Sequence, residues 1–487
     1  MLAARTLSQA IAAGNEALAL RAAAILARAG KLPVEGRLLL LGEALDRRQW
    51  KNAETQVDAI QKDEVFAFLA PVLRAWTAYG SGKGDPVSPL LGLGNNPLAN
   101  SYADEPRAMI LLASGKTKEG LEALGPIVEE SGVRSERLRA AAAAVLARKG
   151  KKEQAQTLLS GEGSAAARGR LAAGKAPGAE IATPAAGVAE LLLRVAVDLN
   201  AQQVPEVALR FARLSTFMAP ANSEGWLITA ELLAAANQSQ AALTAIERIP
   251  ADDMFAERAA QRRLAVLVDA GRPDEAIARA RAAALAPSAP LEAWVRYGDL
   301  LAQTEKYDEA AVAYERALAL YKDGETPVPL WSVHLLRGNV YTQAGKWAEA
   351  KAALQEAYRL APRQPVVLNF LGYSQLERRE NLAEAERLIQ EASRLQPDDA
   401  AITDSLGWAI YIRGDIPKAI ELLERAARGQ PADPAINEHL GDAYYSAGRR
   451  YEARYAWRAA LIYAEGKAVD RLKGKIDVGL RPELAAP

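Results

Sequence analysis

The stretch LGWAIYIRGDIPKAIELLERAARGQP occupies residues 406–431, and PAINEHLGDAYYSAGRRYEARYAWRAAL follows at residues 434–461. The second stretch repeats the order of residue types in the first: Leu-Gly, a later Gly, an Ala and a bulky apolar residue each recur after 34 residues. A period of this length is typical of stacked helix pairs, in which each copy buries its apolar side against the next. The stretch therefore predicts a fold built by repetition.

The period extends through the second half of the chain as a ladder of alanines spaced 34 to 40 residues apart. Its members are Ala208, Ala242, Ala276, Ala310, Ala350, Ala385, Ala419 and Ala453. A second ladder, of mostly small residues, precedes each alanine and consists of Ala196, Ala230, Leu264, Gly298, Gly338, Gly372, Gly407 and Gly441. Turn glycines separate the two ladders, and bulky residues follow the alanines by four positions. Each repeat is thus predicted to be a helix, a glycine turn and a closely crossing second helix.

This order resembles the tetratricopeptide repeat, whose pattern is a large residue, Leu-Gly, Tyr, Ala, an aromatic residue, Ala and a closing Pro. Its best match consists of Leu440, Gly441, Tyr444, Ala453, Trp457 and Ala460. The resemblance covers residues 189–467, about eight repeats. It implies an all-α fold, an α-solenoid in which helix hairpins wind into a right-handed superhelix.

Two insertions and several substitutions depart from the pattern. KDGETPVP at residues 322–329 is polar and contains proline, so we expect it to bulge from a turn between repeats. An extra residue lies near residues 378–381. Ala196 and Ala230 stand in place of glycine, and Leu264 replaces any small residue, so the earliest repeats are expected to pack less regularly.

Residues 1–160 are predicted to be a degenerate arm of the same helical repeats, because their apolar residues recur at helical spacing. The predicted helices lie at residues 2–28, 36–60, 65–79, 103–112 and 134–149. Residues 81–100 are rich in Gly, Pro and Asn and are predicted to form a loop.

A Gly-, Ala- and Pro-rich segment, residues 161–188, is the predicted boundary between this arm and the repeats at 189–467. A short helix is expected inside it at residues 164–173. Residues 468–487 are left as a tail after the last repeat.

Charge and hydropathy favour a protein or peptide partner. Lys plus Arg equals Asp plus Glu, at 60 each, so no net field attracts nucleic acid or an anionic bilayer. No apolar run approaches the roughly 20 residues that cross a membrane, so no transmembrane segment is predicted. The sequence opens directly in a helical segment. If a leader was removed, we expect a periplasmic or outer-membrane-associated protein, and otherwise a cytoplasmic one.

The chain has no cysteine, which excludes disulfides, thiolate catalysis and sulfur-ligated metal. This composition fits an oxidising compartment, where a free thiol is a liability, but cysteine-free cytosolic proteins are also common. A lipid anchor on a mature N-terminal cysteine would have been lost with a leader.

A search for catalytic and cofactor motifs finds none with the required spacing. His334 and His439 are the only histidines, and neither belongs to a metal-binding pair, so each is interpreted as a packing or groove-edge residue. GLG at residues 92–94 resembles the start of a dinucleotide loop, but Pro97 occupies the third glycine's place. We interpret that segment as a plain loop.

Paired acidic residues at 252–253 and 398–399 precede predicted helices, where carboxylates favour the N-terminus, so capping is preferred to acid catalysis. No set of nucleophile, base and orienting residue is present. We therefore expect no enzyme activity, no metal and no cofactor.

The resemblance places ligand-contacting positions on the first helix of each repeat, around the conserved small residue, facing a concave groove. In this sequence these positions are Asn339, Thr342, Asn369, Tyr373, Asp404, Trp408, Tyr411, Glu438, Asp442 and Tyr445. Amides can hold a ligand backbone, aromatic rings offer apolar area, and carboxylates favour Lys or Arg on the partner.

Packing against the next repeat is the alternative interpretation of these residues, most of all for Trp408 and Tyr411. The lysines by which chaperone-binding tetratricopeptide domains hold a C-terminal carboxylate are missing from the mapped positions, which argues against a cochaperone. The basic residues at 449–475 are interpreted as a solvated terminal helix, with a docking patch for an acidic partner as the alternative.

Phrases such as LNFLGYSQLERRENLAEAERLI and DDAAITDSLGWAIY look like those of bacterial envelope tetratricopeptide proteins, some of which are outer-membrane lipoprotein adaptors. The resemblance implies a non-enzymatic scaffold in the cell envelope. More specific alternatives are an adaptor that delivers substrates to a periplasmic C-terminal-processing protease, or one that assists surface-structure assembly. From another class, the chain could be the targeting arm of an enzyme whose catalytic domain is a separate chain. Nucleic-acid binding would need a continuous basic face.

Overall fold

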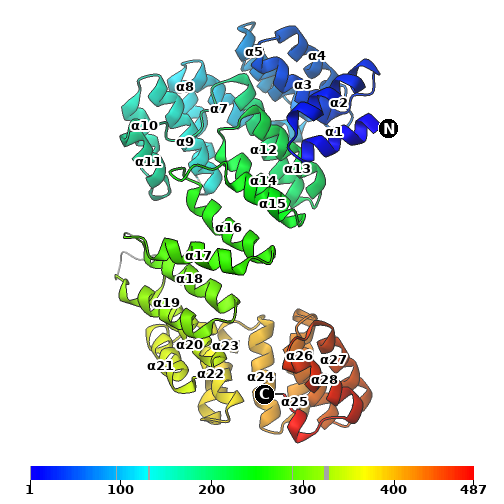
Figure 1. Cartoon of the computed structure of the whole chain (residues 1–487), viewed down its shortest axis with the longest axis vertical. Helices are drawn as coiled ribbons and strands as arrows, with labels where there is room; N and C mark the ends of the chain where they lie inside the picture. Colours follow the sequence, from blue (N-terminus) through cyan, green and yellow to red (C-terminus); the bar gives the residue numbers. More distant parts are fainter. Residues whose placement is uncertain (1, 95, 130–131, 288, 323–327, 487) are drawn as a thin grey trace. The chain divides into compact units, whose positions relative to one another are not determined.

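The computed structural model describes residues 2–94, 96–129, 132–287, 289–322 and 328–486. Within these ranges the regular elements are all helical, and no strand is present in them. The chain divides into two compact units, residues 1–276 (unit 1) and residues 277–487 (unit 2) (Figure 1).

Unit 2 is a series of helix hairpins in which each hairpin packs against the next. The hairpins are α18 (Leu291–Gln303) with α19 (Tyr307–Ala319), α20 (Leu330–Gln343) with α21 (Trp347–Leu360), α22 (Pro365–Glu377) with α23 (Leu382–Leu395), α24 (Ala400–Ile412) with α25 (Ile416–Gly429), and α26 (Pro434–Ser446) with α27 (Arg450–Tyr463). They are followed by α28 (Lys467–Val478) and the 3-10 turn η5 (Pro482–Leu484). The predicted all-α solenoid is confirmed.

The two ladders of small residues pack as the sequence indicates. All eight ladder alanines are 0% exposed. A Cβ on Gly407 would come within 2.9 Å of the Leu423 side chain, and one on Gly441 would overlap Trp457. Glycine is needed there because the bulky partner already fills the space at the helix crossing. Leu264, where the small residue is missing, is only partly buried.

Turns inside the hairpins use the left-handed backbone region. Gly414 and Gly448 have φ values of +93° and +80°, which cost glycine little. The turn between α22 and α23 has no glycine, and Arg379 and Asn381 adopt φ values of +51° and +48° instead. The extra residue near 378–381 is accommodated in this turn. Of the other predicted insertion, at 322–329, residues 323–327 lie outside the described residues.

Unit 1 also consists of helix pairs. Its helices are α1 (Leu2–Ala12), α2 (Glu16–Arg28), α3 (Val34–Asp46), α4 (Trp50–Gln61), α5 (Ala70–Ser81), α6 (Pro97–Ser101), α7 (Asp104–Ala113), α8 (Thr117–Leu124), α9 (Val133–Arg148), α10 (Lys152–Leu158), α11 (Ala165–Ala172), α12 (Pro184–Ala201), α13 (Pro205–Met218), α14 (Ser223–Ala235), α15 (Ser239–Ile246) and α16 (Ala256–Asp269). Four 3-10 turns lie between them: η1 (Ala67–Leu69), η2 (Ser88–Leu90), η3 (Gly125–Val128) and η4 (Glu162–Ser164). Helix α17 (Pro273–Ala284) continues past the division between the units.

The two longest helices predicted in unit 1 are each a hairpin instead. Residues 2–28 break at Gly14, with φ +75°, and the Asn15 side chain then accepts a hydrogen bond from the Leu18 N–H at 3.0 Å to start α2. Residues 36–60 break at Arg48, with φ +54°. An arginine in the left-handed region leaves no turn signal in the sequence, which is why that break was missed.

Most of the other elements predicted in unit 1 are confirmed. The helices expected at 103–112, 134–149 and 164–173 are confirmed as α7, α9 and α11. The helix expected at 65–79 begins only at Ala70, after η1. In the stretch 81–100, residues 82–87, 91–94 and 96 are loop, and the rest of the described residues belong to α5, η2 and α6.

Unit 1 does not follow the nearest-neighbour stacking of a simple solenoid. Helix α12 packs against α3, α5 and α7, and α13 packs against α1 and α3. Gly187 of α12 lies so close to Trp76 of α5 that a Cβ there would overlap the indole, and the Arg213 Nε of α13 donates to the Ala12 carbonyl at 3.2 Å. The N-terminal helices thus surround the first regular hairpin. The predicted boundary at 161–188 lies inside this unit, and the division into arms there stays a prediction.

Within the described ranges, no helix has the length and apolar character needed to span a bilayer.

Candidate protein-binding face

The first helices of successive repeats in unit 2 lie side by side, with α22 against α24 and α24 against α26. We call the side chains predicted to contact a ligand on α20, α22, α24 and α26 the inner row. An aspartate caps the N-terminus of each of the helices α24 and α26. Asp399 accepts the Ile402 N–H at 2.9 Å, and Asp433 accepts the Ile436 N–H at 3.0 Å. The capping role expected for Asp399 is confirmed.

An aromatic stack forms the centre of the inner row. The Trp408 ring lies between Tyr411, with centroids 4.7 Å apart, and His439, with centroids 4.1 Å apart, and both pairs are nearly parallel at 11° and 14°. Tyr373 of α22 lies against His439 at 6.4 Å. Trp408 is only 3% exposed, so it packs within the unit, as the alternative interpretation held. Tyr411 is half-buried, and its hydroxyl is 2.9 Å from Ser446 Oγ.

His439, the last ring of this stack, also pairs with a carboxylate. His439 Nδ1 is 3.0 Å from both carboxylate oxygens of Asp404, and His439 is 2% exposed. Burial lowers the pKa of His439, but the neighbouring Asp404, Asp442 and Glu438 carboxylates raise it more, so the net direction is above its usual value. The sequence indicated a packing role for His439 but not this pairing, because the two residues come from different repeats.

Three buried charged side chains, Glu438, Asp442 and Lys475, form a cluster with the partly buried Arg471 at the α26 end of the inner row. Lys475 of α28 places its Nζ 2.6 Å from Glu438 Oε1 and 2.8 Å from each oxygen of Asp442. Arg471 binds Glu438 through two hydrogen bonds of 2.7 and 2.8 Å. Asp442 also accepts the Trp457 Nε1–H at 2.9 Å. Acidic residues of the inner row are therefore matched by cations of the chain itself.

The pKa values of the two carboxylates in this cluster move in opposite directions. Burial raises the pKa of Glu438, but Arg471 and Lys475 lower it more, and the net direction is downward. Burial raises the pKa of Asp442 by more than Lys475 lowers it, so that carboxyl lies above its usual range. The deeper of the two carboxylates thus retains a desolvation penalty despite its pairing.

These contacts correct two expectations. The carboxylates Asp404, Glu438 and Asp442 were expected to favour Lys or Arg on a partner, but each already has a basic partner within the chain. The basic residues at 449–475 were interpreted as solvated, and five of them are exposed, namely Arg449, Arg450, Arg458, Lys467 and Lys473, but Lys475 is 0% exposed. The physical reason is that α28 folds onto the inner row and buries Lys475 there, with Arg471 partly buried beside it.

The remaining inner-row residues are Asn339, Thr342, Asn369 and Tyr445. Asn339 and Thr342 are half-buried on α20, and the Thr342 hydroxyl donates to the Gly338 carbonyl at 2.9 Å. Asn369 Oδ1 is buried without a hydrogen-bond partner among the described residues. Tyr445 lies against Trp457, with ring centroids 5.6 Å apart. The structure therefore gathers the α22, α24 and α26 positions around one aromatic and charged cluster, with the α20 positions further along the row.

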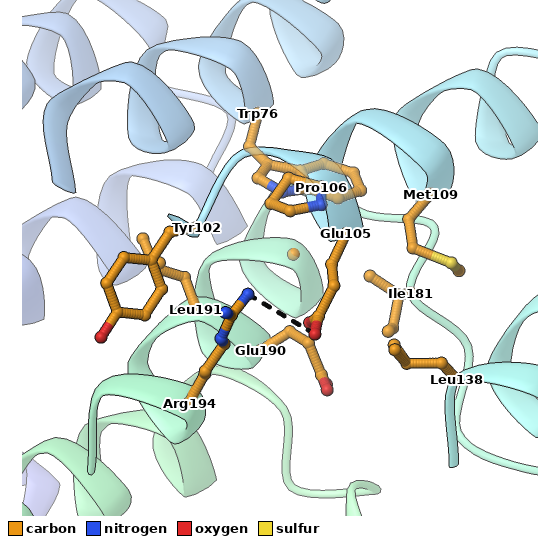
Figure 2. Close-up of a pocket in the computed structure, with 11 residues that line it drawn as sticks. Trp76, Tyr102, Glu105, Pro106, Met109, Leu138, Ile181, Glu190, Leu191 and Arg194 are labelled. Carbon is orange, nitrogen blue, oxygen red and sulfur yellow. Dashed lines mark ion pairs between the residues drawn. The ribbon is translucent and has the colours of Figure 1, made fainter. Parts of the chain in front are cut away.

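Unit 1 contains a small pocket between α5, α7, α9 and α12, shown in Figure 2. Apolar walls come from Trp76, Met109 and Leu138, and Arg194 meets Glu105 at the polar side with 3.5 Å between the charged atoms. Its free volume of about 10 Å³ has room for roughly one water molecule. The pocket is therefore too small for an organic ligand.

An ion network behind this pocket joins four helices of unit 1. Arg134 of α9 pairs with Glu105, with Glu190 and, at 3.3 Å, with Glu224, and Arg137 pairs with Glu190 at 3.0 Å. Each carboxylate faces at least one guanidinium, so the network ties α7, α9, α12 and α14 together. Sequence analysis did not detect it, because its members come from separate helix pairs.

Two minor predictions can also be located. GLG at residues 92–94 lies in the loop after η2, as expected, with left-handed φ values at both glycines. Asp252 pairs with Arg170 at 2.8 Å and with Lys175 at 2.7 Å, and Asp253 accepts the Phe255 N–H at 3.0 Å. Among the residues that the structure describes, no group of His, Cys, Asp and Glu has the arrangement of a metal site.

Comparison with known proteins gives matches to the tetratricopeptide repeat. Family models with that description match residues 266–325, 331–364, 371–434 and 405–468. No curated protein matches the chain.

Similar solved structures include YrrB, a tetratricopeptide protein with an unusual peptide-binding site, at 18% identity over 40% of this chain and 97% of that chain, with a TM-score of 0.29. TTC0263, a thermophilic tetratricopeptide protein from Thermus thermophilus, is 22% identical over 38% of this chain and 97% of that one, with a TM-score of 0.33. A chain of the Cut9–Hcn1 hetero-tetramer of APC/C is 15% identical over 91% of this chain and 96% of that one, with a TM-score of 0.40.

Proposed function

Because the chain is a tetratricopeptide-repeat protein, we propose that unit 2 is a scaffold that binds a protein or peptide on its inner row. Tetratricopeptide repeats serve as protein-interaction scaffolds, and proteins of this fold are generally non-catalytic. Repetition provides a long face without requiring a reactive centre. The binding role, rather than any chemistry, is what the side chains of this face support.

The observation that carries the proposal is the buried Oδ1 of Asn369, which has no hydrogen-bond partner among the described residues. An unsatisfied buried acceptor costs about 1–3 kcal/mol. If the partly buried Asn369 side chain turns toward the groove on binding, a backbone N–H of the peptide would pair with Oδ1 and recover that cost. Asn339 and Thr342 on the neighbouring α20 extend the same polar stretch.

Asn369→Ala tests this proposal because its two expected effects differ in sign. Removing the unpartnered amide should leave the free chain as stable as before, or more stable, while partner binding weakens about tenfold, the equivalent of about 1.4 kcal/mol. Thermal unfolding and binding of the purified partner measure the two effects. Equal binding by the variant and the parent chain would reject the role of Asn369.

Photo-crosslinking identifies the partner for that measurement. A photoreactive residue at Thr342 of the inner row should trap it in native cell extract, and mass spectrometry identifies it. The matched control places the same residue at Gln390, which is exposed on the second helix α23. Crosslinks that are equal at both positions would place binding elsewhere.

We further propose that this scaffold is an adaptor in the bacterial cell envelope. The absence of cysteine and the likeness of the repeat phrases to envelope tetratricopeptide proteins support this setting. Fractionation of the source cell with an antibody to the chain tests it directly. A signal confined to the cytoplasmic fraction would reject the envelope setting and leave the scaffold role intact.

A further inference from the structure

The residues that follow α28 return to the inner row. We call residues 480–486 the return segment. It leaves α28 at Gly479, whose φ is +87° and where a Cβ would overlap the Tyr445 hydroxyl. At its far end, the Ala486 N–H donates to Asp442 Oδ2 at 3.1 Å.

Ala486 occupies a small apolar seat on the inner row. It is 9% exposed and belongs to the same apolar cluster as Trp408 and Ala409, against which Tyr373 and Tyr411 pack. The seat thus combines aromatic surfaces for a methyl-sized side chain with a carboxylate that accepts a backbone N–H. These are the features expected of a site for an extended peptide.

The return segment is held mainly at its ends. Arg481, Pro482, Glu483 and Ala485 are exposed, Leu480 and Leu484 are partly buried, with Leu484 close to Gly474 of α28, and only Ala486 is fully buried. Chain held by so few buried contacts opens at low free-energy cost compared with the helices beneath it. In contrast, α28 is fixed by the buried Lys475. The segment can therefore leave the inner row while α28 stays in place.

We propose that the return segment is an internal ligand of the inner row, and that the partner is an extended peptide with a small apolar residue at the position of Ala486. The partner binds by displacing the return segment. This inference rests on the proposed scaffold function and specifies its ligand and its regulation. Because a tethered ligand competes at an effective concentration in the millimolar range, the intact chain binds such a peptide more weakly than a chain without the segment.

The experiment uses a fluorescent peptide with the sequence GLRPELAAP, residues 479–487, and fluorescence anisotropy. A chain that lacks residues 480–487 should bind the peptide at least about tenfold more tightly than the intact chain. A peptide with Ala486→Trp should lose binding, because the seat admits only a methyl-sized side chain. The matched peptide with Ala485→Trp, at the exposed neighbouring position, should bind as the parent peptide does.

A second variant protects the test against misfolding of the shortened chain. Ala486→Asp in the full chain places a carboxylate beside Asp442, so it should expel the segment by charge repulsion and bind the peptide like the shortened chain. If neither variant binds the peptide while helix content is retained, the inference is rejected. Tighter binding of the Ala486→Trp peptide than of the parent peptide would also reject it. A non-specific apolar surface would bind the larger side chain more tightly, whereas a site for a methyl-sized side chain would not.

These outcomes separate the inference from the proposed function. Crosslinking of a partner from Thr342 without any peptide binding would reject the internal ligand and leave the scaffold role. Loss of partner crosslinking together with clear peptide binding would mean that the inner row serves only the chain's own segment.

Discussion

Lys475→Met is the sharpest test of the buried charge cluster on the inner row. The substitution keeps a long apolar stem but removes an ammonium group that is 0% exposed. Glu438 retains both hydrogen bonds from Arg471, at 2.7 and 2.8 Å, so its charge stays paired. The effect of the substitution therefore falls chiefly on Asp442.

The magnitude follows from what Asp442 loses. Lys475 Nζ is 2.8 Å from both Asp442 oxygens, and both side chains are 0% exposed. The groups that remain, the Trp457 Nε1–H and the Ala486 N–H, carry no charge. Leaving one member of a buried pair without its partner costs roughly 3–5 kcal/mol. We therefore expect α26 to α28 to be less stable by roughly 3–5 kcal/mol at pH 7.

The loss should depend on pH in a defined direction. Burial already raises the pKa of Asp442, and removing Lys475 raises it further. An acid whose pKa is higher in the folded than in the unfolded state binds its proton more tightly when folded, so acid favours folding of the variant. The stability that Lys475→Met loses relative to the parent should thus become smaller as the pH falls from 7 through the raised pKa of Asp442. Lys475→Met combined with Asp442→Asn should recover most of it, because no buried charge is left unpaired.

Hydrogen exchange resolved by mass spectrometry is the appropriate assay, because repeat arrays open locally and unit 1 serves as an internal reference. Amides of α26 to α28 should lose protection equivalent to about 3–5 kcal/mol, and those of unit 1 should not change. Lys473→Met, on the exposed side of the same helix, is the matched control. A loss below about 1 kcal/mol, the level of an exposed ion pair, would show that Asp442 is solvated and refute this account of the cluster.

Three further substitutions test separate parts of the chain. Ala419→Leu should overpack a ladder position that is 0% exposed and cost on the order of 1–3 kcal/mol, measured by chemical denaturation; a neutral result would contradict the assigned helix crossing. His439 has a raised pKa beside Asp404, so its contribution to stability is complete below about pH 6.5 and is lost as the pH rises through the raised value. Melting temperatures of the parent should accordingly fall with rising pH relative to those of His439→Gln, and parallel curves would exclude the pairing. Arg137→Met in unit 1 should cost about 1.5–3 kcal/mol, because Glu190 loses this hydrogen bond but keeps the one from Arg134, and a loss below about 1 kcal/mol in denaturant would mean that the network is hydrated.

The repeat pattern predicts much of unit 2, because helix crossings depend on residues close together in the sequence. Gly407 and Leu423 belong to one hairpin, and their small-to-large match recurs in every copy. The turn at Arg379 and Asn381 was also marked by an extra residue. In unit 1 the pattern was weaker, and the break at Arg48 gave no signal, since its φ of +54° is one that an arginine seldom adopts.

The position of the inner row was likewise predicted from the repeat register, since residues placed around Gly407 and Gly441 do lie on adjacent first helices. The pattern did not predict which inner-row side chains are free to contact a partner. The carboxylate of Asp442 is occupied by groups 33 and 44 residues away, at Lys475 and Ala486, outside the repeat pattern.

The order of residues alone determined the helix hairpins, their close crossings and the adjacency of the first helices, because a periodic pattern encodes contacts between neighbours in the chain. Only the tertiary structure decided which charges on the inner row are already neutralised and which segment covers it. Those contacts join residues far apart in the chain: Asp404 and His439 belong to different repeats, and Asp442 pairs with Lys475, which follows the last repeat. Their strength comes from exclusion of water after folding, and residue spacing does not encode that exclusion.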